Sequence, residues 1–166
     1  MKYQPNRNYV SNDCVATPEV LVYRLVQHFN PKGRILEPCK GSGNFFKWLP
    51  VGSLWCEITE GWDFFAFEEK VDWIITNPPW SKMRGFLRHS MKVSDNVVFL
   101  MTINHLWTRA RLRDMDELGF GIREIVLLDT PSEFPPLGFQ LGAVWLKKGY
   151  KGSIELTDWR DFSGTL

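Results

Sequence analysis

The sequence predicts an α/β fold in which a mostly parallel sheet has helices on both faces and ends with an antiparallel C-terminal strand. Short apolar runs alternate with segments of helical periodicity along most of the chain, which is typical of this fold class. The last two strong apolar runs, 122–128 and 142–147, have no helical segment between them. Because parallel neighbours need a long crossover, we expect this pair to form an antiparallel, hairpin-like finish.

Composition and charge fit one globular domain. The chain has 166 residues, of which 44% are hydrophobic and 23% are charged, and a chain of this size can bury a substantial core. We expect a single domain over 1–166, in which the polar, aperiodic residues 1–16 form a flexible arm. The net charge of +1 excludes a strongly basic, histone-like protein but permits a local basic face.

Neither a membrane anchor nor a metal site is expected. No apolar run reaches the ~18 residues of a membrane span, and the N-terminus lacks the apolar core of a signal peptide, so we expect a cytoplasmic protein. The three cysteines, Cys14, Cys39 and Cys56, are an odd number at wide spacings. This pattern indicates neither a zinc site nor a disulfide framework.

The first helix is expected to begin at Thr17-Pro18-Glu19. Thr17 can cap it, Pro18 suits its first position and Glu19 complements the helix dipole. Apolar residues recur at helical spacing up to Phe29, and Asn-Pro-Lys-Gly at 30–33 ends the helix. The next elements alternate in type, with strands expected at 34–37, 53–58, 72–76 and 96–102, and helices at 45–49, 82–93 and 105–118.

A glycine-containing loop, Glu37-Pro38-Cys39-Lys40-Gly41-Ser42-Gly43, follows the first expected strand. Ligands of open α/β sheets bind beyond the carboxyl ends of the strands, and glycines there let the backbone approach a ligand closely. Glu37 can pair with a cation or accept hydrogen bonds from a polar ligand. A tight turn that binds nothing explains the glycines equally well, since a lone Gly-x-Gly is weak evidence.

Acidic residues lie at the end of the second expected strand and just beyond it. Glu57 stands at its end, where a carboxylate can accept hydrogen bonds from both hydroxyls of a ribose; a solvated strand-end carboxylate is the alternative. Asp63, beside Phe64 and Phe65, can accept the exocyclic amine of adenine while a ring packs on the base. The alternative is a capping or turn aspartate with both phenylalanines in the core.

The most specific motif is Asn77-Pro78-Pro79-Trp80, directly after a buried strand. Two consecutive prolines fix the backbone and donate no hydrogen bonds, so their carbonyls and the Asn77 amide oxygen are expected to be acceptors. Such acceptors suit a substrate NH2 group, because accepting its hydrogens frees the nitrogen lone pair for attack. Trp80 offers a flat face for stacking a planar substrate. A strand-ending Pro-Pro loop with Trp80 in the core is the alternative.

Together these elements resemble the class I S-adenosylmethionine-dependent methyltransferases, and among them the amino-methyltransferases with an Asn/Asp-Pro-Pro-aromatic motif, most of all the DNA adenine-N6 enzymes. The resemblance covers about 17–148 and implies a Rossmann-like sheet and S-adenosylmethionine as cofactor. It implies that the catalytic residues are Asn77, Pro78, Pro79 and Trp80. It implies that the cofactor-binding residues are Thr17, Pro18, Glu37, Pro38, Gly41, Gly43, Glu57, Asp63 and Phe64.

Two departures from the family pattern qualify what the resemblance implies. The segment between Glu57 and Asp72 is short, so the family's usual helix and third strand must be abbreviated. The family members with this motif order carry a target-recognition domain after the catalytic domain, and we expect none here. Target recognition would then come from a partner, either a second copy in a homodimer or a recognition subunit, or from the N-terminal arm or the loop 129–141. The apolar residues of this loop can form a docking surface or a wall of the substrate pocket: Phe134, Pro135, Pro136, Leu137 and Phe139. A loop folded over the sheet edge is the alternative.

The resemblance implies methyl transfer to the exocyclic N6 amine of adenine in DNA. Phosphate contacts need a basic face, and the candidates are Lys82, Arg84, Arg88, Lys92, Arg109, Arg111 and Arg113; a solvated helix face is the alternative. Three other interpretations stay open: methylation of an RNA base amine, methylation of a protein glutamine amide, and a non-catalytic methyltransferase-like subunit.

Overall fold

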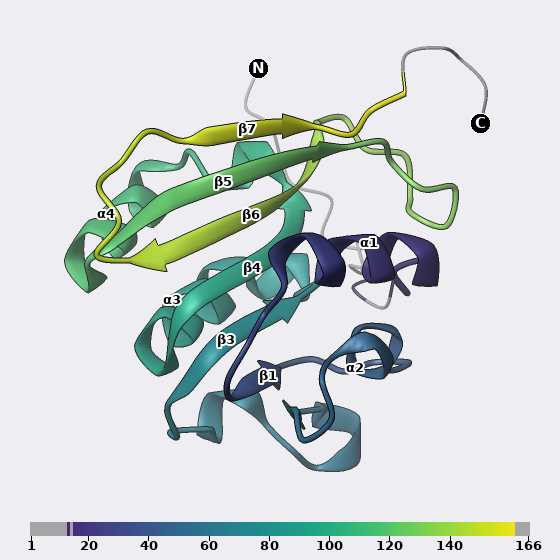
Figure 1. The fold of residues 1–166 in the computed structure, drawn as a ribbon, viewed down its shortest axis with the longest axis vertical. Coiled ribbons are helices and arrows are strands. Elements are labelled where there is room, and N and C mark those ends of the chain that lie inside the picture. Colours follow the sequence, from purple (N-terminus) through teal and green to yellow (C-terminus); the bar gives the residue numbers. More distant parts are fainter. Residues whose placement is uncertain (1–12, 14, 162–166) are drawn as a thin grey trace, which may run out of the picture.

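The computed structural model describes Asp13 and residues 15–161, and these form a seven-stranded sheet covered by helices (Figure 1). The strand order is β2-β1-β3-β4-β6-β5-β7. The strands are β1 (Ile35–Glu37), β2 (Leu54–Trp55), β3 (Val71–Thr76), β4 (Ser94–Thr102), β5 (Phe120–Leu128), β6 (Leu141–Lys148) and β7 (Glu155–Asp158).

The pairing of the strands confirms the predicted fold class. β1, β2, β3 and β4 are parallel to one another, and β6 runs antiparallel to both β4 and β5. In the central parallel pair, Val71 of β3 lies opposite Ser94 of β4 and Thr76 opposite Phe99. This register brings the carboxyl ends of β1, β3 and β4 to one edge of the sheet, where ligands of such sheets bind.

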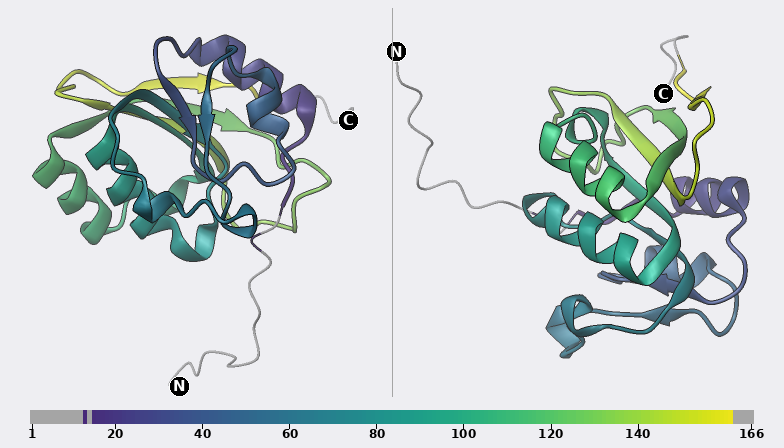
Figure 2. Two further views of the ribbon diagram at one scale, coloured as in Figure 1. Left: turned by 90° about the horizontal axis from the view of Figure 1, so that it is seen from below. Right: turned by 90° about the vertical axis from the view of Figure 1, so that its left-hand side faces the viewer.

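Helices cover both faces, as predicted (Figure 2). On one face lie α1 (Glu19–Phe29) and α2 (Asn44–Trp48), and on the other α3 (Met83–Val93) and α4 (Arg109–Leu118). Each pair buries its apolar stripe in a separate core cluster: Leu25 and Phe45 belong to one, Leu87 and Met115 to the other. The strands between them carry near-continuous apolar runs because both of their faces are buried.

The segment between β2 and β3 is abbreviated. It contains two 3-10 helices, η1 (Ile58–Glu60) and η2 (Phe64–Ala66), and no strand is described between Trp55 and Val71. The short two-residue β2 is therefore the edge strand on this side. Two more 3-10 turns, η3 (Trp80–Lys82) and η4 (Ile103–His105), precede α3 and α4.

Three sequence expectations need correction. The expected helix 105–118 begins only at Arg109, after η4. β7 was not expected, and its sequence Glu-Leu-Thr-Asp is mostly exposed at the sheet edge, so it lacks an apolar run. Thr17 does not cap α1, since Pro18 is the N-cap and no side chain caps the helix.

The expected flexible arm, 1–16, lies mostly outside the described residues. Its described members contact the loop after β3: Asp13 accepts a hydrogen bond from the backbone N–H of Ser81 at 3.2 Å, and the Val15 carbonyl accepts one from Asn77 at 3.3 Å. In the part of the chain that the structure describes, no helix is long and apolar enough to cross a membrane.

Candidate active site

The Asn77-Pro78-Pro79-Trp80 motif follows β3 directly and lies at the carboxyl edge of the sheet. Trp80 opens η3, and the Pro79 carbonyl accepts a hydrogen bond from the backbone N–H of Lys82 at 3.0 Å. The expectation that both proline carbonyls are spare acceptors is therefore wrong for Pro79. The Pro78 carbonyl and the Asn77 amide oxygen are the candidate acceptors.

The orientation of the Asn77 amide is fixed by two acceptors. Its Nδ2 donates to the Val15 carbonyl at 3.3 Å and to the Thr17 hydroxyl at 3.2 Å. Because a carbonyl can only accept, the amide must present its NH2 group to Val15. The other atom, Asn77 Oδ1, is buried and has no hydrogen-bond partner in the described structure.

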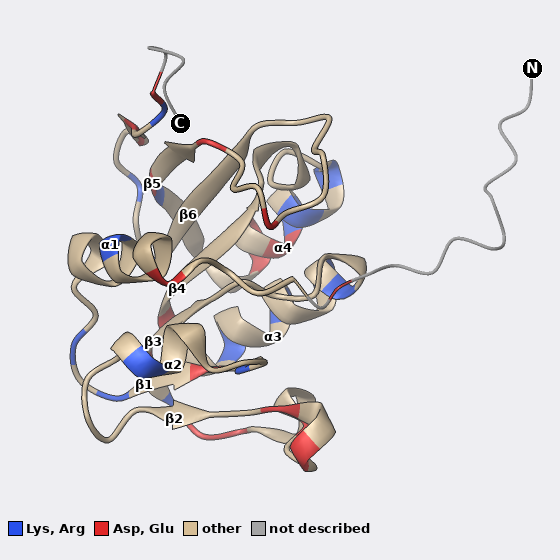
Figure 3. Ribbon diagram, turned by 90° about the vertical axis from the view of Figure 1, so that its right-hand side faces the viewer, with Lys and Arg blue, Asp and Glu red and all other residues tan. Residues whose placement is uncertain are grey.

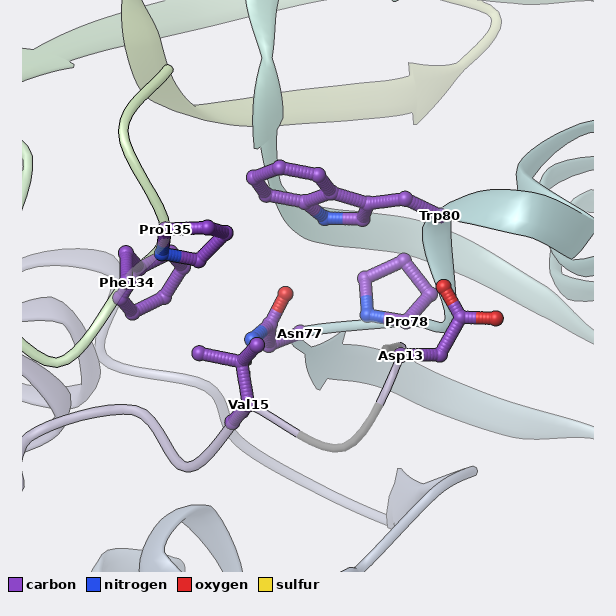
Figure 4. A pocket seen from close by; sticks show the side chains of 7 residues that line it. All are labelled: Asp13, Val15, Asn77, Pro78, Trp80, Phe134 and Pro135. Atoms are coloured by element: carbon purple, nitrogen blue, oxygen red, sulfur yellow. Dashed lines mark hydrogen bonds between the residues drawn. The ribbon is translucent and has the colours of Figure 1, made fainter. Parts of the chain in front are cut away.

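That unpartnered oxygen borders a cavity of about 40 Å³ (Figure 4). In the close-up, Oδ1 of Asn77 points toward the indole of Trp80, and Pro135 lies beside Phe134 on the side away from Pro78. A buried acceptor without a partner costs free energy of about 1–3 kcal/mol unless a ligand satisfies it. The lining residues are Asp13, Val15, Asn77, Pro78, Trp80, Phe134 and Pro135.

The walls of the cavity are aromatic and rigid. The indole N–H of Trp80 donates to the Leu100 carbonyl at 3.3 Å, which holds the ring against β4. The ring of Phe134 lies 6.1 Å from that of Trp80, at 45°. Phe134 and Pro135 thus line the cavity beside Trp80; that this cavity takes a substrate stays a prediction.

The glycine loop needs its glycines for backbone reasons. Gly41 has φ 51° and Gly43 φ 87°, both in the left-handed region, and a Cβ at Gly43 would meet no atom within 4 Å. A side chain there would be strained although space is available. The loop leads into α2, whose Asn44 donates from Nδ2 to the Thr17 carbonyl at 2.7 Å.

Glu37 is a buried carboxyl at the end of β1, with 1% of its surface exposed. Its Oε1 accepts hydrogen bonds from the Thr76 hydroxyl and from the backbone N–H of Cys39 at 3.4 Å. Its Oε2 is buried and has no partner within the described chain. Burial, only partly opposed by the hydrogen bond from Thr76, raises the pKa of Glu37 to about 8. Pro38, which follows it, is buried.

The carboxylate of Glu57 is tied to the glycine loop. It accepts from the backbone N–H of Gly41 at 2.8 Å and from the Thr59 hydroxyl at 2.7 Å. Burial acts against ionisation, but these hydrogen bonds and the nearby charge of Lys40 outweigh it and lower the pKa of Glu57. The carboxylate is therefore ionised at neutral pH and lies beside the loop. Its predicted role in holding a ribose stays a prediction.

The positions of Asp63 and Phe64 are explained by local structure, because Asp63 caps a 3-10 helix and Phe64 packs in the core. Asp63 is the N-cap of η2 and accepts from the Phe65 N–H at 2.9 Å. The Phe64 ring is buried against Phe86, at 5.2 Å, and His89, at 4.7 Å. Whether either residue also contacts an adenine stays a prediction.

Sequence reasoning did not single out two exposed apolar residues near Glu57 in the chain, Ile58 and Trp62. Ile58 is 66% exposed and Trp62 63% exposed, and Trp62 forms an isolated bridge with Glu57. The sequence does contain a sign of this, because the large apolar residue Ile58 directly follows Glu57. That Ile58 is exposed cannot be read from the sequence, and only its exposure makes it a candidate for contact with a ligand.

The expected phosphate-binding role of Arg84 and Arg88 is not supported. Both guanidinium groups bind the buried carboxylate of Asp114 on α4, Arg84 at 2.7 Å, and Arg88 also binds Glu117 at 3.0 Å. These bonds raise the pKa of both arginines and, despite burial, lower that of Asp114. The pairs join α3 to α4, so the positive charges on this helix face are largely compensated.

Comparison with known proteins places the fold. Neither a family model nor a curated protein matches the sequence. Among solved structures, a protein described as a modification subunit of a type I restriction enzyme from Vibrio vulnificus is similar at TM-score 0.67 and 18% identity. The match covers 91% of this chain and 48% of that one, so the chain spans about half the length of this neighbour.

Two further neighbours match over more of their own length. One, described as a class I S-adenosylmethionine-dependent methyltransferase from Listeria monocytogenes, has TM-score 0.70 and 14% identity, over 95% of this chain and 69% of that one. The other, described as an RNA methyltransferase from Pyrococcus horikoshii, has TM-score 0.53 and 15% identity, over 78% and 82%. The chain therefore has the Rossmann-like fold of the class I S-adenosylmethionine-dependent methyltransferases.

Proposed function

We propose that this chain is an S-adenosylmethionine-dependent methyltransferase that modifies the exocyclic N6 amine of adenine in DNA. The observation that carries the proposal is the buried, unpartnered Oδ1 of Asn77, which points into an aromatic slot beside Trp80. A flat ring with an NH2 substituent complements both features, since the ring stacks and the amine donates.

The residues of the chain act mainly by positioning the amine. Asn77 Oδ1 accepts one amine hydrogen and the Pro78 carbonyl accepts the other, so that the nitrogen lone pair points away from the ring. Trp80 offers its indole face to the base, and Phe134 lines the same cavity. A base within a duplex cannot reach this slot, so it must be flipped out, at a cost of a few kcal/mol, or come from an unpaired strand. Catalysis then depends on orientation and on preorganised acceptors.

The residues around the glycine loop fit the proposed cofactor. S-adenosylmethionine, when bound, supplies an electrophilic methyl group on a positively charged sulfur. The unpartnered Oε2 of Glu37 favours a positively charged ligand group nearby, because a cation stabilises the carboxylate. The open space over Gly43 lets a ligand approach the backbone. The residues proposed to hold the cofactor are Thr17, Pro18, Glu37, Pro38, Gly41, Gly43, Glu57, Asp63 and Phe64.

Exposed apolar side chains beside Glu57 add to this cofactor proposal. Ile58 directly follows Glu57 in the chain and Trp62 pairs with its backbone, and an adenine ring lying near these exposed side chains would remove apolar surface from water. We include both residues in the proposed adenosine-binding region.

DNA is the proposed substrate because one structural neighbour is described as a modification subunit of a restriction enzyme. Its description as a subunit also supports a recognition partner. The neighbour described as an RNA methyltransferase keeps an RNA base amine as the second candidate. A protein glutamine amide also presents an NH2 on a planar group, and the substrate assay must include it.

The test is transfer of labelled methyl groups from S-adenosylmethionine to single-stranded DNA, duplex DNA, RNA and cell-extract protein. The proposal predicts label in DNA, recovered as N6-methyladenine after hydrolysis. Label confined to RNA or protein would support methyl transfer but show that the substrate is RNA or protein rather than DNA. Absence of label in every substrate, together with cofactor binding in calorimetry, would favour the non-catalytic interpretation.

A further inference from the structure

The charges of α4 are arranged against the stability of the helix. Its first half carries Arg109, Arg111 and Arg113, whereas its second half carries the acids, beginning at Asp114. Figure 3 shows this order as a blue stretch of α4 followed by a red one. Cations at a helix N-terminus meet the positive end of the helix dipole, which disfavours them. Local stability therefore does not explain the three arginines.

Two arginines of α4, and Lys82 at the start of α3, lack an acidic partner within the described chain. Lys82, Arg109 and Arg113 are exposed and form no ion pair with any residue of the described chain. Arg111 is half-buried and donates to the His105 carbonyl at 2.8 Å. Burial and the nearby positive charge of Arg84 lower the pKa of Arg111. An external anion would relieve this concentration of positive charge.

An exposed tryptophan lies two residues before Arg109 in the chain. Trp107, between η4 and α4, is 48% exposed, and within 15–161 its ring makes no ring contact, cation contact or indole hydrogen bond. Stacking on a planar partner would remove this apolar face from water. Its flat face is available for stacking.

The segment that carries Trp107 and the start of α4 lies next to the proposed substrate slot. The ring of His105 meets that of Trp80 edge-on, with centroids 6.4 Å apart. Lys82 lies two residues beyond Trp80, and Trp107 lies two residues beyond His105. Arg109 and Arg113 are four residues apart on α4 and so share one helix face. We name Lys82, Trp107, Arg109 and Arg113 the Trp107 surface.

We propose that the Trp107 surface binds an unpaired strand of DNA next to the target base, with the cations on phosphates and the Trp107 indole stacked on a neighbouring base. The inference rests on the proposed function for the choice of DNA. The cations complement a phosphate backbone in charge, and every base offers a face for stacking. An acidic peptide would match the cations but leave the Trp107 ring without a planar partner.

The test is fluorescence anisotropy of the full chain with a labelled single-stranded oligodeoxynucleotide of about 12 nucleotides, without cofactor and over a series of salt concentrations. Trp107→Ala is expected to weaken binding by about fivefold or more, the loss of one stacked base. Trp48→Ala, which removes a partly exposed tryptophan on α2, is the matched control and should leave the affinity within twofold.

The contribution of the phosphate contacts to binding is tested by a double variant, Arg109→Glu with Arg113→Glu. It should reduce the slope of log affinity against log salt by about 1.4, from two lost phosphate contacts to a single strand. The control pair Lys32→Glu with Lys151→Glu makes the same charge change in loops before β1 and β7. For this control, the slope of log affinity against log salt should stay close to that of the wild type. Since the arginines oppose the helix dipole, the double variant should fold at least as stably as the wild type.

Three results would overturn the inference: Trp107→Ala binding like Trp48→Ala, equal salt slopes for the two charge variants, or tighter binding of an RNA strand of the same sequence than of DNA. The outcome is separable from the proposed function. Strand binding through the Trp107 surface without methyl transfer would remove the function and keep the surface. If Trp107→Ala changed neither DNA methylation nor strand binding, the proposed function would stand and the Trp107 surface would be ruled out as a strand-binding site.

Discussion

The hydroxyl of Thr17 accepts a hydrogen bond of 3.2 Å from the amide of Asn77, across 60 residues of sequence. The carbonyl of the same Thr17 accepts from Asn44, the first residue of the helix after the glycine loop, at 2.7 Å. One buried residue thus connects the proposed cofactor loop to the proposed catalytic motif. It also keeps the amide oxygen of Asn77 directed into the slot.

Replacing Thr17 by valine should lower kcat. The substitution keeps the shape of the side chain and the backbone carbonyl but removes the acceptor for Asn77, and one lost hydrogen bond of about 1 kcal/mol corresponds to roughly a fivefold lower rate. Steady-state kinetics should show this in kcat, with KM for DNA little changed. Thr157→Val, which removes a hydroxyl bonded to Glu124 at the sheet edge, is the control. Equal kcat for the two variants would refute the positioning role.

Gly43→Ala should weaken cofactor binding more than Gly52→Ala. Both glycines have positive φ, 87° and 91°, and a Cβ at either meets no atom within 4 Å, so the backbone strain of about 1–2 kcal/mol is matched. Only the Cβ at Gly43 would enter the proposed cofactor space. Calorimetry with S-adenosylmethionine measures the difference, and equal dissociation constants for the two variants would argue against a cofactor at this loop.

The stability of the ligand-free protein should fall as the pH rises from about 5 to 8. Burial raises the pKa of Glu37 to about 8 in the folded chain, whereas an unfolded glutamate ionises near 4.3. Between these values the folded state binds more protons than the unfolded state, so rising pH favours unfolding. Urea unfolding at several pH values should show a smaller decrease for Glu37→Gln than for the wild type. The same slope in both proteins would contradict a protonated, buried Glu37.

Trp80→Ala should reduce substrate affinity by removing the stacking face. A stacked base contributes about 1–3 kcal/mol, so we expect at least a fivefold weaker interaction with DNA that contains the target base. Trp80→Phe keeps an aromatic face and should retain more of the affinity, although it loses the hydrogen bond to Leu100. Binding titrations of the two variants measure the difference. A similar loss in both would indicate that Trp80 acts only in packing.

Most of the fold was predictable because its signals are local. The first helix ends at Phe29, as its periodicity and the turn residues after it predict, and the apolar runs became the buried strands β3, β4, β5 and β6. β7 escaped prediction because an exposed edge strand needs no apolar pattern. The 3-10 turns around Ile58 and Phe64 escaped it because they are held by side-chain caps rather than by periodicity.

The site was predictable in its composition but not in its contacts. The motif at Asn77 predicts an amine acceptor, yet which amide atom faces the slot depends on Val15 and Thr17, more than 50 residues away. The helical spacing of Arg84 and Arg88 predicts a cationic face, but Asp114 of another helix binds both side chains. Local sequence patterns carry no information on such distant partners.

The central claim is that Asn77 Oδ1 accepts a hydrogen bond from the reacting amine. The most direct measurement compares methyl transfer to adenine-containing DNA by the wild type and by Asn77→Ala, with S-adenosylmethionine binding measured on both proteins. We predict N6-methyladenine in the wild-type reaction, a loss of about a hundredfold or more in kcat for the variant, the scale of one preorganised polar contact, and cofactor affinity within twofold. Methyl transfer by Asn77→Ala at the wild-type rate would contradict the claim.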